Sequence, residues 1–484
     1  MTDQASVFQR RRTGVLLHVT SLPARNIGDD AYRFIDFLAE TGVTVWQVLP
    51  LGPTHDDGSP YQCLSAHAAN SELICREAIK SRSWANPDEL TGSNMSIILA
   101  DAYHQFERNA SAEQKQQFVE FCHQNSYWLD DYVLFCEIRH LNHTKAWFDW
   151  PEPLRDRDPA ALEAVKKDRK LALRIRCFGQ FLFFDQWYSL KQYANDKGVL
   201  LFGDIPIFVA HDSADVWSNK SLFTLDNTGQ ATLVAGVPPD YFSATGQRWG
   251  NPLYKWGAHQ DEDYRWWQQR LTTQLALFDL LRIDHFRGFE ACWEIPAGCE
   301  TAIEGRWVKA PGDAIFDKLL SVFNELPLVA EDLGIITDEV TALREKYAMP
   351  GMKILQFAFG SDASNPYLPH KHCQDSVVYT GTHDNNTTLG WYEELDMYTK
   401  AHIKAYFGDS DEEIPWLLNR AALQSVAELA VLPMQDILAL DGEHRMNVPG
   451  TVAGNWQWHF SWDMVTDTYK KRLHELNKLY GRCN

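Results

Sequence analysis

The sequence predicts an α/β protein built on a (β/α)8 TIM barrel. Short apolar segments of strand length alternate with amphipathic segments of helical period along most of the 484 residues. Eight such apolar segments are present, the number of strands that the barrel needs. The competing architecture is a doubly wound open sheet, which favours a Gly-rich phosphate turn after the first strand. Neither GxGxxG nor GxxxxGK[ST] occurs there, so the barrel is the preferred prediction.

The predicted strands are spread over the whole chain, with helical sequence such as 31–40 and 337–347 between them. They are expected at 14–23, 43–54, 198–209, 280–288, 326–334, 351–360, 375–385 and 430–440. The segment 70–198 breaks the alternation and is predicted to be a mostly helical insertion. Without a repeat or a flexible Gly/Ser linker, residues 1–484 are expected to form one catalytic barrel domain with insertions packed on it.

Composition excludes several classes of function. The formal net charge of −20 argues against nucleic acid or an anionic membrane as partner, because both need a basic surface. No run of about 18 apolar residues occurs, and MTDQASVFQRRRTG lacks the apolar core of a signal peptide. Nine cysteines without metal-ligand spacing fit reduced thiols, so a cytoplasmic protein is expected. The 18 Trp and 18 Tyr could form a large core or a stacking surface for sugars.

Ionisable residues gather where several predicted strands end. The stretch LLRIDHFRGFE (280–290) opens as a buried strand and yet contains Arg282, Asp284, His285 and Arg287. The other strand-end residues of this kind are Asp204, Glu331, Asp332, His383 and Asp384. A single buried acid is commonly structural. Acids on four different strands, however, would meet at the C-terminal mouth of a barrel, where the active site of this fold is built.

The spacing of these residues predicts two carboxyl groups with different protonation. Arg282 and Asp284 are two apart in a strand, so they lie on one face, and the guanidinium keeps Asp284 ionised. Glu331 follows the apolar run LPLVA, which predicts a raised pKa and a protonated acid. Such a pair is suited to glycoside chemistry with retention, for which the two groups must lie about 5–5.5 Å apart.

A metal site is the alternative interpretation of the same cluster. Its candidate ligands are His18, Asp204, Asp284, Glu331, His383 and Asp384. Arg282 and Arg287 would place positive charge beside the ion, and no HxH pair ends a strand. No phosphate or dinucleotide motif is present either. We therefore expect no metal and no cofactor.

Several motifs resemble those of the 4-α-glucanotransferases of the amylomaltase or disproportionating-enzyme type, glycoside hydrolase family 77. They are LRIDHFRG, VAEDLG, TGTHDNNTT, GVLLHVTSLP, VWQVLPLGPT, SPYQ, GDIPIFVAHDSADVW, GVPPDYFSATGQRWGNPLY and GNWQW. The resemblance covers nearly the whole chain in order. It implies a (β/α)8 barrel with inserted subdomains and no C-terminal β-domain, and the short stretch after the eighth predicted strand agrees with this.

The resemblance also implies roles for individual residues. Asp284 matches the nucleophile, Glu331 the general acid/base and Asp384 the third acid, which acts on ring distortion and sugar hydroxyls. The residues compared with substrate-binding or site-organising positions are Arg282, His383, Tyr61, Asp204, Gln247, Trp249 and Asn455. Gln247 and Trp249 would lie in an insertion, 209–262, that covers the acceptor side. Asn455 and Trp456 could equally be capping and core residues.

The implied activity is transfer of an α-1,4-glucan segment from a maltooligosaccharide to another glucan or to glucose. An aromatic-rich segment such as GQRWGNPLYKW could shield the intermediate from water and favour transfer. The alternatives are an α-glucan hydrolase or one half-reaction of glycogen debranching, and a catalytically inactive glucan-binding protein. The complete acid set, with Arg282 beside it, disfavours the last of these.

Overall fold

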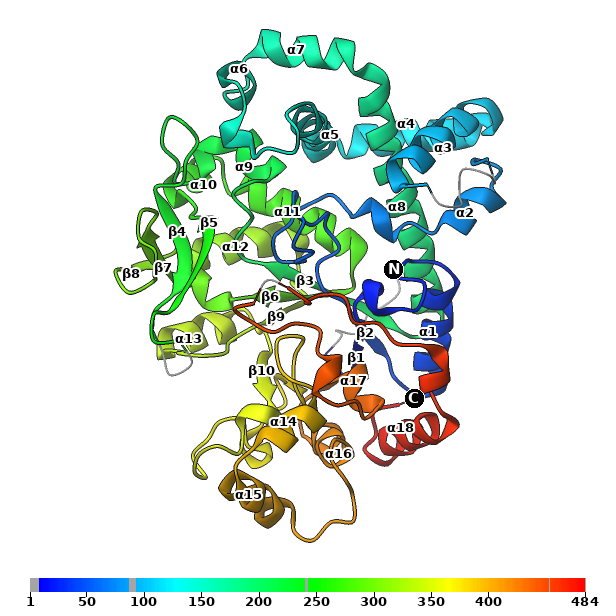
Figure 1. Ribbon diagram of the computed structural model, residues 1–484. Helices are drawn as coiled ribbons and strands as arrows, with labels where there is room; N and C mark the ends of the chain where they lie inside the picture. Colours follow the sequence, from blue (N-terminus) through cyan, green and yellow to red (C-terminus); the bar gives the residue numbers. More distant parts are fainter. Residues whose placement is uncertain (1–7, 87–92, 240–242, 452, 484) are drawn as a thin grey trace.

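The computed structural model describes residues 8–86, 93–239, 243–451 and 453–483. Residues 87–92 and 240–242 of the two predicted insertions, the latter also part of the GVPPDYFSATGQRWGNPLY motif, lie outside the described residues. Eight parallel strands form a closed barrel in the order β1-β12-β11-β10-β9-β6-β3-β2 (Figure 1). They are β1 (Arg12–Leu16), β2 (Val45–Gln47), β3 (Leu200–Pro206), β6 (Leu280–Asp284), β9 (Leu328–Ala330), β10 (Gly351–Ile354), β11 (Ser376–Tyr379) and β12 (Leu429–Pro433). Each coincides with a predicted strand, so the barrel prediction is confirmed.

Successive side chains of a barrel strand point to opposite sides, so they pack in two different apolar clusters, one among the strands and one shared with the helices. In β6, Leu280 belongs to a cluster with residues of other strands such as Phe202 and Val329, whereas Leu281 packs in the larger cluster shared with the helices. Because side chains alternate with a period of two, Arg282 and Asp284 continue the row of Leu280. The barrel therefore directs these two charged groups toward its own mouth.

Helices cover the outside of the barrel and fill the long connection between β2 and β3 (Figure 1). That connection contains α2 (Arg76–Ser81), α3 (Met95–Asn109), α4 (Ala112–Gln124), α5 (Ser126–Leu141), α6 (Glu152–Arg155), α7 (Pro159–Asp168) and α8 (Lys170–Asp196). The helices between or after the other strands include α1 (Asp29–Glu40), α11 (Arg265–Leu277), α12 (Gly312–Phe323), α13 (Asp338–Lys346), α14 (Thr388–Glu394), α15 (Met397–Phe407), α16 (Trp416–Gln424), α17 (Met434–Ile437) and α18 (Asp467–Leu479). Over the described part of the chain, no helix has the length and apolar character needed to cross a membrane.

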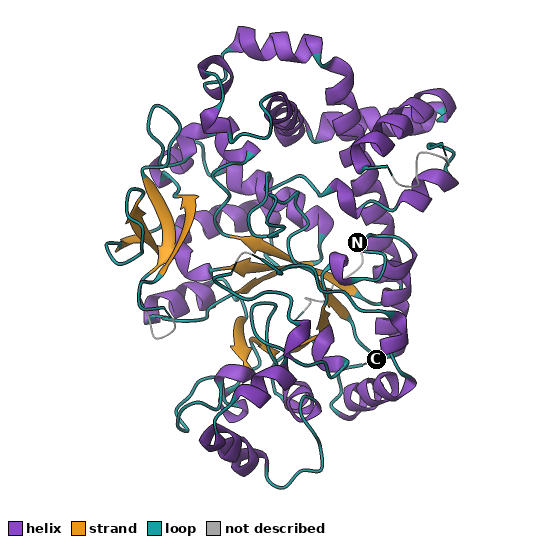
Figure 2. Ribbon diagram, in the orientation of Figure 1, coloured by secondary structure: helices purple, strands orange, loops and turns teal. Residues whose placement is uncertain are grey.

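A second, antiparallel sheet stands beside the barrel, with the order β5-β4-β7-β8 (Figure 2). Its strands are β4 (Leu233–Val237), β5 (Gln247–Pro252), β7 (Ala291–Pro296) and β8 (Arg306–Lys309). The sequence analysis did not anticipate this sheet. The reason is that β5 and β8 read QRWGNP and RWVK, which are mixed or exposed segments without the apolar run that marks a buried strand. The short helices α9 (Ala214–Ser218) and α10 (Trp256–Asp261) belong to the same region of the chain.

Arg482, which follows the last helix, holds the first and the last strand of the barrel together. The Arg482 side chain is buried and donates hydrogen bonds of 2.6–3.3 Å to five carbonyl groups, those of Arg12, Leu423, Ser425, Ala427 and Glu428. These carbonyls belong to β1 and to the segment that leads into β12, the two strands whose pairing closes the barrel. Burial lowers the pKa of Arg482, so the carbonyl dipoles must compensate for its desolvation.

We predict that Arg482→Met lowers the free energy of unfolding by about 2–4 kcal/mol, because the hydrogen bonds from its guanidinium to five carbonyl groups are lost. Denaturant unfolding followed by tryptophan fluorescence measures the change. Lys478→Met, on the exposed side of α18, is the control and should change stability by less than about 0.5 kcal/mol. Equal stability of the two variants would contradict the proposed closure.

Candidate active site

The predicted acids lie at one end of the barrel. Asp204 is in the last part of β3, Asp284 ends β6 and Glu331 directly follows β9. Asp384 lies in the loop after β11. Since the strands are parallel and form a closed barrel, their C-terminal ends share a single rim.

Arg282 joins two of these acids. One of its terminal nitrogens, Nη1, donates to both oxygens of Asp204 at 2.9 and 2.8 Å, and the other, Nη2, donates to Asp284 Oδ1 at 2.7 Å. Burial would lower the pKa of Arg282, but the two carboxylates outweigh it and hold the pKa well above its ordinary value. The side chain of Asp284 is 32% exposed, so one face of this anchored carboxylate remains open to a ligand.

Tyr61 contacts both Asp204 on β3 and His383 in the loop after β11. Its hydroxyl donates to Asp204 Oδ2 at 2.7 Å, and its ring stacks on His383 with centroids 5.1 Å apart and planes at 16°. Burial and the Asp204 carboxylate raise the pKa of Tyr61, so the hydroxyl stays protonated and acts as a donor. The ring of Trp456 lies 6.1 Å from Tyr61 and 5.9 Å from His383. These three rings form an aromatic wall next to the acids.

Glu331 has the environment of a proton donor. Burial, followed by the nearby charge of Asp284, raises its pKa to about 8. The amide groups of His285 and Leu333 donate to its two oxygens at 2.7 and 3.2 Å, which fixes the carboxyl group. The direction of the pKa shift is the one expected from the apolar sequence before it. At neutral pH this carboxyl group is therefore mostly protonated, close to an acid that is held by an arginine.

Asp384 is held by two residues that the sequence analysis did not single out. Asn447 Nδ2 donates to Asp384 Oδ1 at 2.7 Å, and Arg445 Nη2 donates to the Asp384 carbonyl at 3.0 Å. His383 Nε2 lies 3.4 Å from the same carboxylate oxygen. Arg445 and Asn447 lie in an irregular loop after α17, without a periodic pattern or a motif, so only the folded chain reveals their contact with Asp384.

The second sheet brings Gln247 and Trp249 to the same mouth. Both lie on β5, where Trp249 Nε1 donates to Gln247 Oε1 at 3.1 Å. The Trp249 ring meets the ring of His285, the residue after Asp284, edge to face at 4.8 Å. An indole surface therefore packs on the ring of His285, the residue that follows Asp284.

Two other predicted residues are engaged elsewhere. The side chain of Asn455 accepts from Val448 N at 2.9 Å and donates to Thr451, so its contacts favour the structural alternative that the sequence left open. Asp332 accepts from Met352 N at 2.7 Å and faces Gly351, where an added Cβ would lie only 2.3 Å from it. Asp332 therefore links β9 to β10, and its charge is among the causes that raise the pKa of Glu331.

The candidate metal ligands do not converge. Among the residues that the structure describes, no group of three or more His, Cys, Asp or Glu is placed to hold a metal ion. The guanidinium of Arg282 itself lies between Asp204 and Asp284, the position that a cation would need. Burial lowers the pKa of His18 to about 3, so this residue is neutral. Metal-independent chemistry stays a prediction.

Comparison with known proteins gives one consistent answer. The model of glycoside hydrolase family 77, described as 4-alpha-glucanotransferase, matches residues 17–465. A 4-alpha-glucanotransferase of Thermus thermophilus is 47% identical, over 96% of this chain and 98% of its own. A chloroplastic/amyloplastic 4-alpha-glucanotransferase of Solanum tuberosum is 42% identical, over 98% and 87%.

The fold agrees with these sequence relatives. The structure of an amylomaltase from Streptococcus agalactiae in complex with acarbose superposes with a TM-score of 0.94 at 35% identity, over 98% of this chain and all of that one. This chain therefore belongs to the 4-alpha-glucanotransferases of glycoside hydrolase family 77 and is an enzyme that transfers glycosyl groups.

Proposed function

We propose that this enzyme moves a segment of an α-1,4-glucan onto a second glucan or onto glucose, by double displacement with retention of the anomeric configuration. The observation that carries the proposal is that two neighbouring acids have different surroundings, one with an arginine as partner and one with a raised pKa. Asp284 is bound to the buried guanidinium of Arg282, whereas the pKa of Glu331 is raised to about 8. A held carboxylate beside a protonated one matches the nucleophile and the acid that a retaining mechanism needs.

In the first step Asp284 attacks the anomeric carbon while Glu331 gives its proton to the departing glycosidic oxygen. The C–O bond to the leaving sugar breaks as the bond to Asp284 forms, which leaves a glycosyl-enzyme. In the second step the ionised Glu331 takes a proton from the acceptor hydroxyl, whose oxygen displaces Asp284. Arg282, held by Asp204, keeps the nucleophile oriented in both steps.

The remaining residues have proposed roles around this centre. Asp384 and His383 would bind hydroxyls of the reacting sugar, and Tyr61 would form a platform under it, supported by its stacking on His383. Gln247 and Trp249 would receive the acceptor, because β5 places them on the side of His285. The segment 209–262 would cover this side. A role for Asn455 in substrate binding has weaker support, since its polar atoms are occupied within its own loop.

The relatives are named for glucan transfer, and the acarbose complex concerns an oligosaccharide-like ligand in one of them. We extend this to maltooligosaccharides as donors and glucose as an acceptor here. The alternative to glucan transfer is hydrolysis, in which water takes the place of the acceptor glucan. All nine cysteines are free, which fits the proposed cytoplasmic location.

Transfer and hydrolysis differ in the products formed from maltotriose. We expect glucose together with maltooligosaccharides longer than the substrate, because the intermediate is captured by another glucan. High-performance anion-exchange chromatography of the reaction mixture measures both. Formation of glucose and maltose alone, in the ratio that cleavage by water gives, would replace transfer by the hydrolase alternative.

We predict that Asp284→Asn lowers turnover by at least about 10³-fold, because the amide cannot form the glycosyl-enzyme. Asparagine can still accept the hydrogen bond from Arg282, so maltoheptaose binding should persist in isothermal titration calorimetry. Asp261→Asn, at an exposed aspartate on α10, is the matched control and should act like the unmodified enzyme. Normal turnover by Asp284→Asn would remove the nucleophile assignment.

The protonation of Glu331 predicts the alkaline limb of the pH profile. Its pKa of about 8 means that the acid is present below that pH and is lost above it. The kcat/KM for a maltooligosaccharide donor should therefore fall about tenfold per pH unit above pH 8. A steady rise of kcat/KM from pH 7 to 9 would contradict this assignment.

A donor that needs no acid tests the same residue independently. Fluoride leaves without a proton, so Glu331→Gln should lose activity on maltotriose but still release fluoride from α-maltosyl fluoride. The release should stop after about one equivalent, because the variant also lacks the base of the second step. No fluoride release would mean that Glu331 acts in some other way.

A further inference from the structure

The loop that carries Tyr61 is held by polar contacts and has little regular structure of its own. Residues 59–69 lie between β2 and the short helix Ser71–Leu73, and apart from an isolated β-bridge between Cys63 and Thr54 they form turns, bends and irregular segments. Backbone groups of the loop bond to side chains from distant elements: Gln180 of α8 bonds both the amide and the carbonyl of Ala69 at 2.9 Å. Gln274 of α11 donates to the Ala66 carbonyl at 3.0 Å. The position of Tyr61 therefore depends on residues that are remote in sequence.

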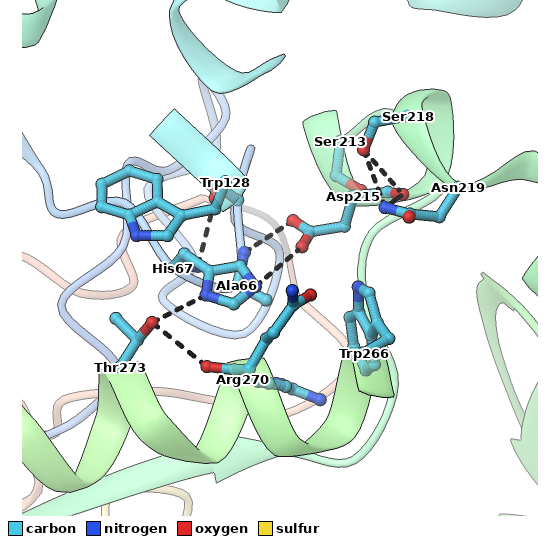
Figure 3. A network of polar contacts seen from close by, with 12 residues as sticks. Ala66, His67, Trp128, Ser213, Asp215, Ser218, Asn219, Trp266, Arg270 and Thr273 are labelled. Atoms are coloured by element: carbon cyan, nitrogen blue, oxygen red, sulfur yellow. Dashed lines mark hydrogen bonds and ion pairs between the residues drawn. The ribbon is translucent and has the colours of Figure 1, made fainter. Parts of the chain in front are cut away.

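The centre of this anchoring is a buried chain of three side chains (Figure 3). Thr273 Oγ1 of α11 lies 2.9 Å from His67 Nδ1, and His67 Nε2 lies 3.7 Å from Asp215 Oδ1 of α9. The other oxygen of Asp215 accepts from Ala66 N at 2.7 Å. His67 is also packed against the parallel ring of Trp128, with centroids 6.0 Å apart. All three members of the chain are at most 5% exposed.

Asp215 has an unusual environment for a buried acid. Burial raises its pKa to about 6, and burial also lowers the pKa of His67 to about 3, so the histidine is neutral. Because His67 is neutral, its contact with Asp215 at 3.7 Å is not an ion pair, and the charge of Arg270 offsets only part of the effect of burial on the pKa of Asp215. Burying a carboxyl group this way costs free energy that an apolar side chain would avoid. The Asp215 carboxyl group accepts the hydrogen bond of the Ala66 amide, which an apolar side chain could not do.

A small pocket lies next to Tyr61. It is open in part to solvent and is lined by Tyr61 and Asp204 together with His67 and Arg270. Arg270 donates to the carbonyls of Pro206 and Ile207, which follow Asp204 in the chain. Atoms that line a void lack packing partners on that side. Close packing alone therefore does not fix the 59–69 loop, and its polar contacts carry more of that task.

We propose that Thr273, His67 and Asp215 are positioning residues for glycosyl transfer, because they hold the 59–69 loop so that Tyr61 reaches Asp204 and lies under the donor sugar. None of the three contacts the reacting atoms, and the inference rests on the proposed function of Tyr61. It predicts that the network acts through Tyr61. A purely structural role would instead lower stability and affect every variant alike.

A double-mutant cycle separates these two roles. Thr273→Val keeps the shape of the side chain and removes its hydroxyl, and we expect it to lower kcat/KM for maltotriose by about tenfold. In the Tyr61→Ala background the same change should have less than about a twofold effect, because there is no ring left to position. Equal losses in the two backgrounds, or a Thr273→Val enzyme within twofold of the unmodified one, would overturn the proposal.

Matched variants control the cycle. Thr272→Val, next to Thr273 but exposed and bonded only within its own helix, should leave kcat/KM unchanged. Tyr127→Phe removes the other hydroxyl that contacts Thr273, at 2.8 Å, and should have less effect than Thr273→Val. Thr273→Ser should restore activity to within about twofold, because its hydroxyl can reach His67. Failure of this rescue would contradict the role of the hydroxyl.

Variants of Asp215 test the same proposal, and they can be used even if Thr273→Val does not fold. Asp215→Asn keeps an oxygen for the Ala66 amide and should stay within about threefold of the unmodified enzyme, whereas Asp215→Ala should lose about tenfold, again only when Tyr61 is present. Equal activity of the two variants would count against the proposal. The products that the unmodified enzyme forms from maltotriose test the proposed function separately, since the cycle compares rates whether the acceptor is a glucan or water.

Discussion

The buried guanidinium of Arg282 is the constraint on which the site depends. A charge inside a barrel must be compensated, and here Asp204 does so from the neighbouring strand β3 and Asp284 from the same strand as Arg282. The register of β3 and β6 sets Asp204 opposite Arg282 and Pro206 opposite Asp284. The strand pairing that forms the barrel therefore also brings Asp204 to the arginine that holds Asp284. Any shift of that register would separate the arginine from one of its two partners.

The same arrangement explains why two acids within one mouth behave differently. Asp284 shares Arg282 with Asp204, whereas Glu331 accepts hydrogen bonds from the backbone amides of His285 and Leu333 and, among the described residues, from no arginine. The charge on Asp284 is itself one of the causes that raise the pKa of Glu331. The carboxylate of the proposed nucleophile thus helps to keep the proposed acid protonated. The two roles are consequences of one charge distribution.

Sequence patterns revealed the parts that the barrel itself positions. Asp204, Asp284 and Glu331 lie on strands or directly after them, so an apolar run followed by an acid was a sufficient signal. The antiparallel sheet was missed because β5 and β8 have no apolar run. Asn447 and the Thr273–His67–Asp215 chain were missed for another reason: their partners are 63 to 206 residues away, and no local pattern encodes such a contact. For Asn455 the sequence left two alternatives, and the observed contacts support the structural one.

The rim of the barrel is therefore built by two different physical means. Strand pairing fixes the acids that are proposed to act on the glycosidic bond, because they lie on a strand or directly after one. Tyr61 and Asp384, which are proposed to hold the sugar, lie on irregular segments held by side chains from other elements: Asp215, Gln180 and Gln274 for one loop, Arg445 and Asn447 for the other. Loss of one such contact leaves the barrel core intact, because the strands do not depend on it. If Tyr61 and Asp384 hold the sugar as proposed, changes at these anchors would alter sugar binding while the central acids keep their geometry.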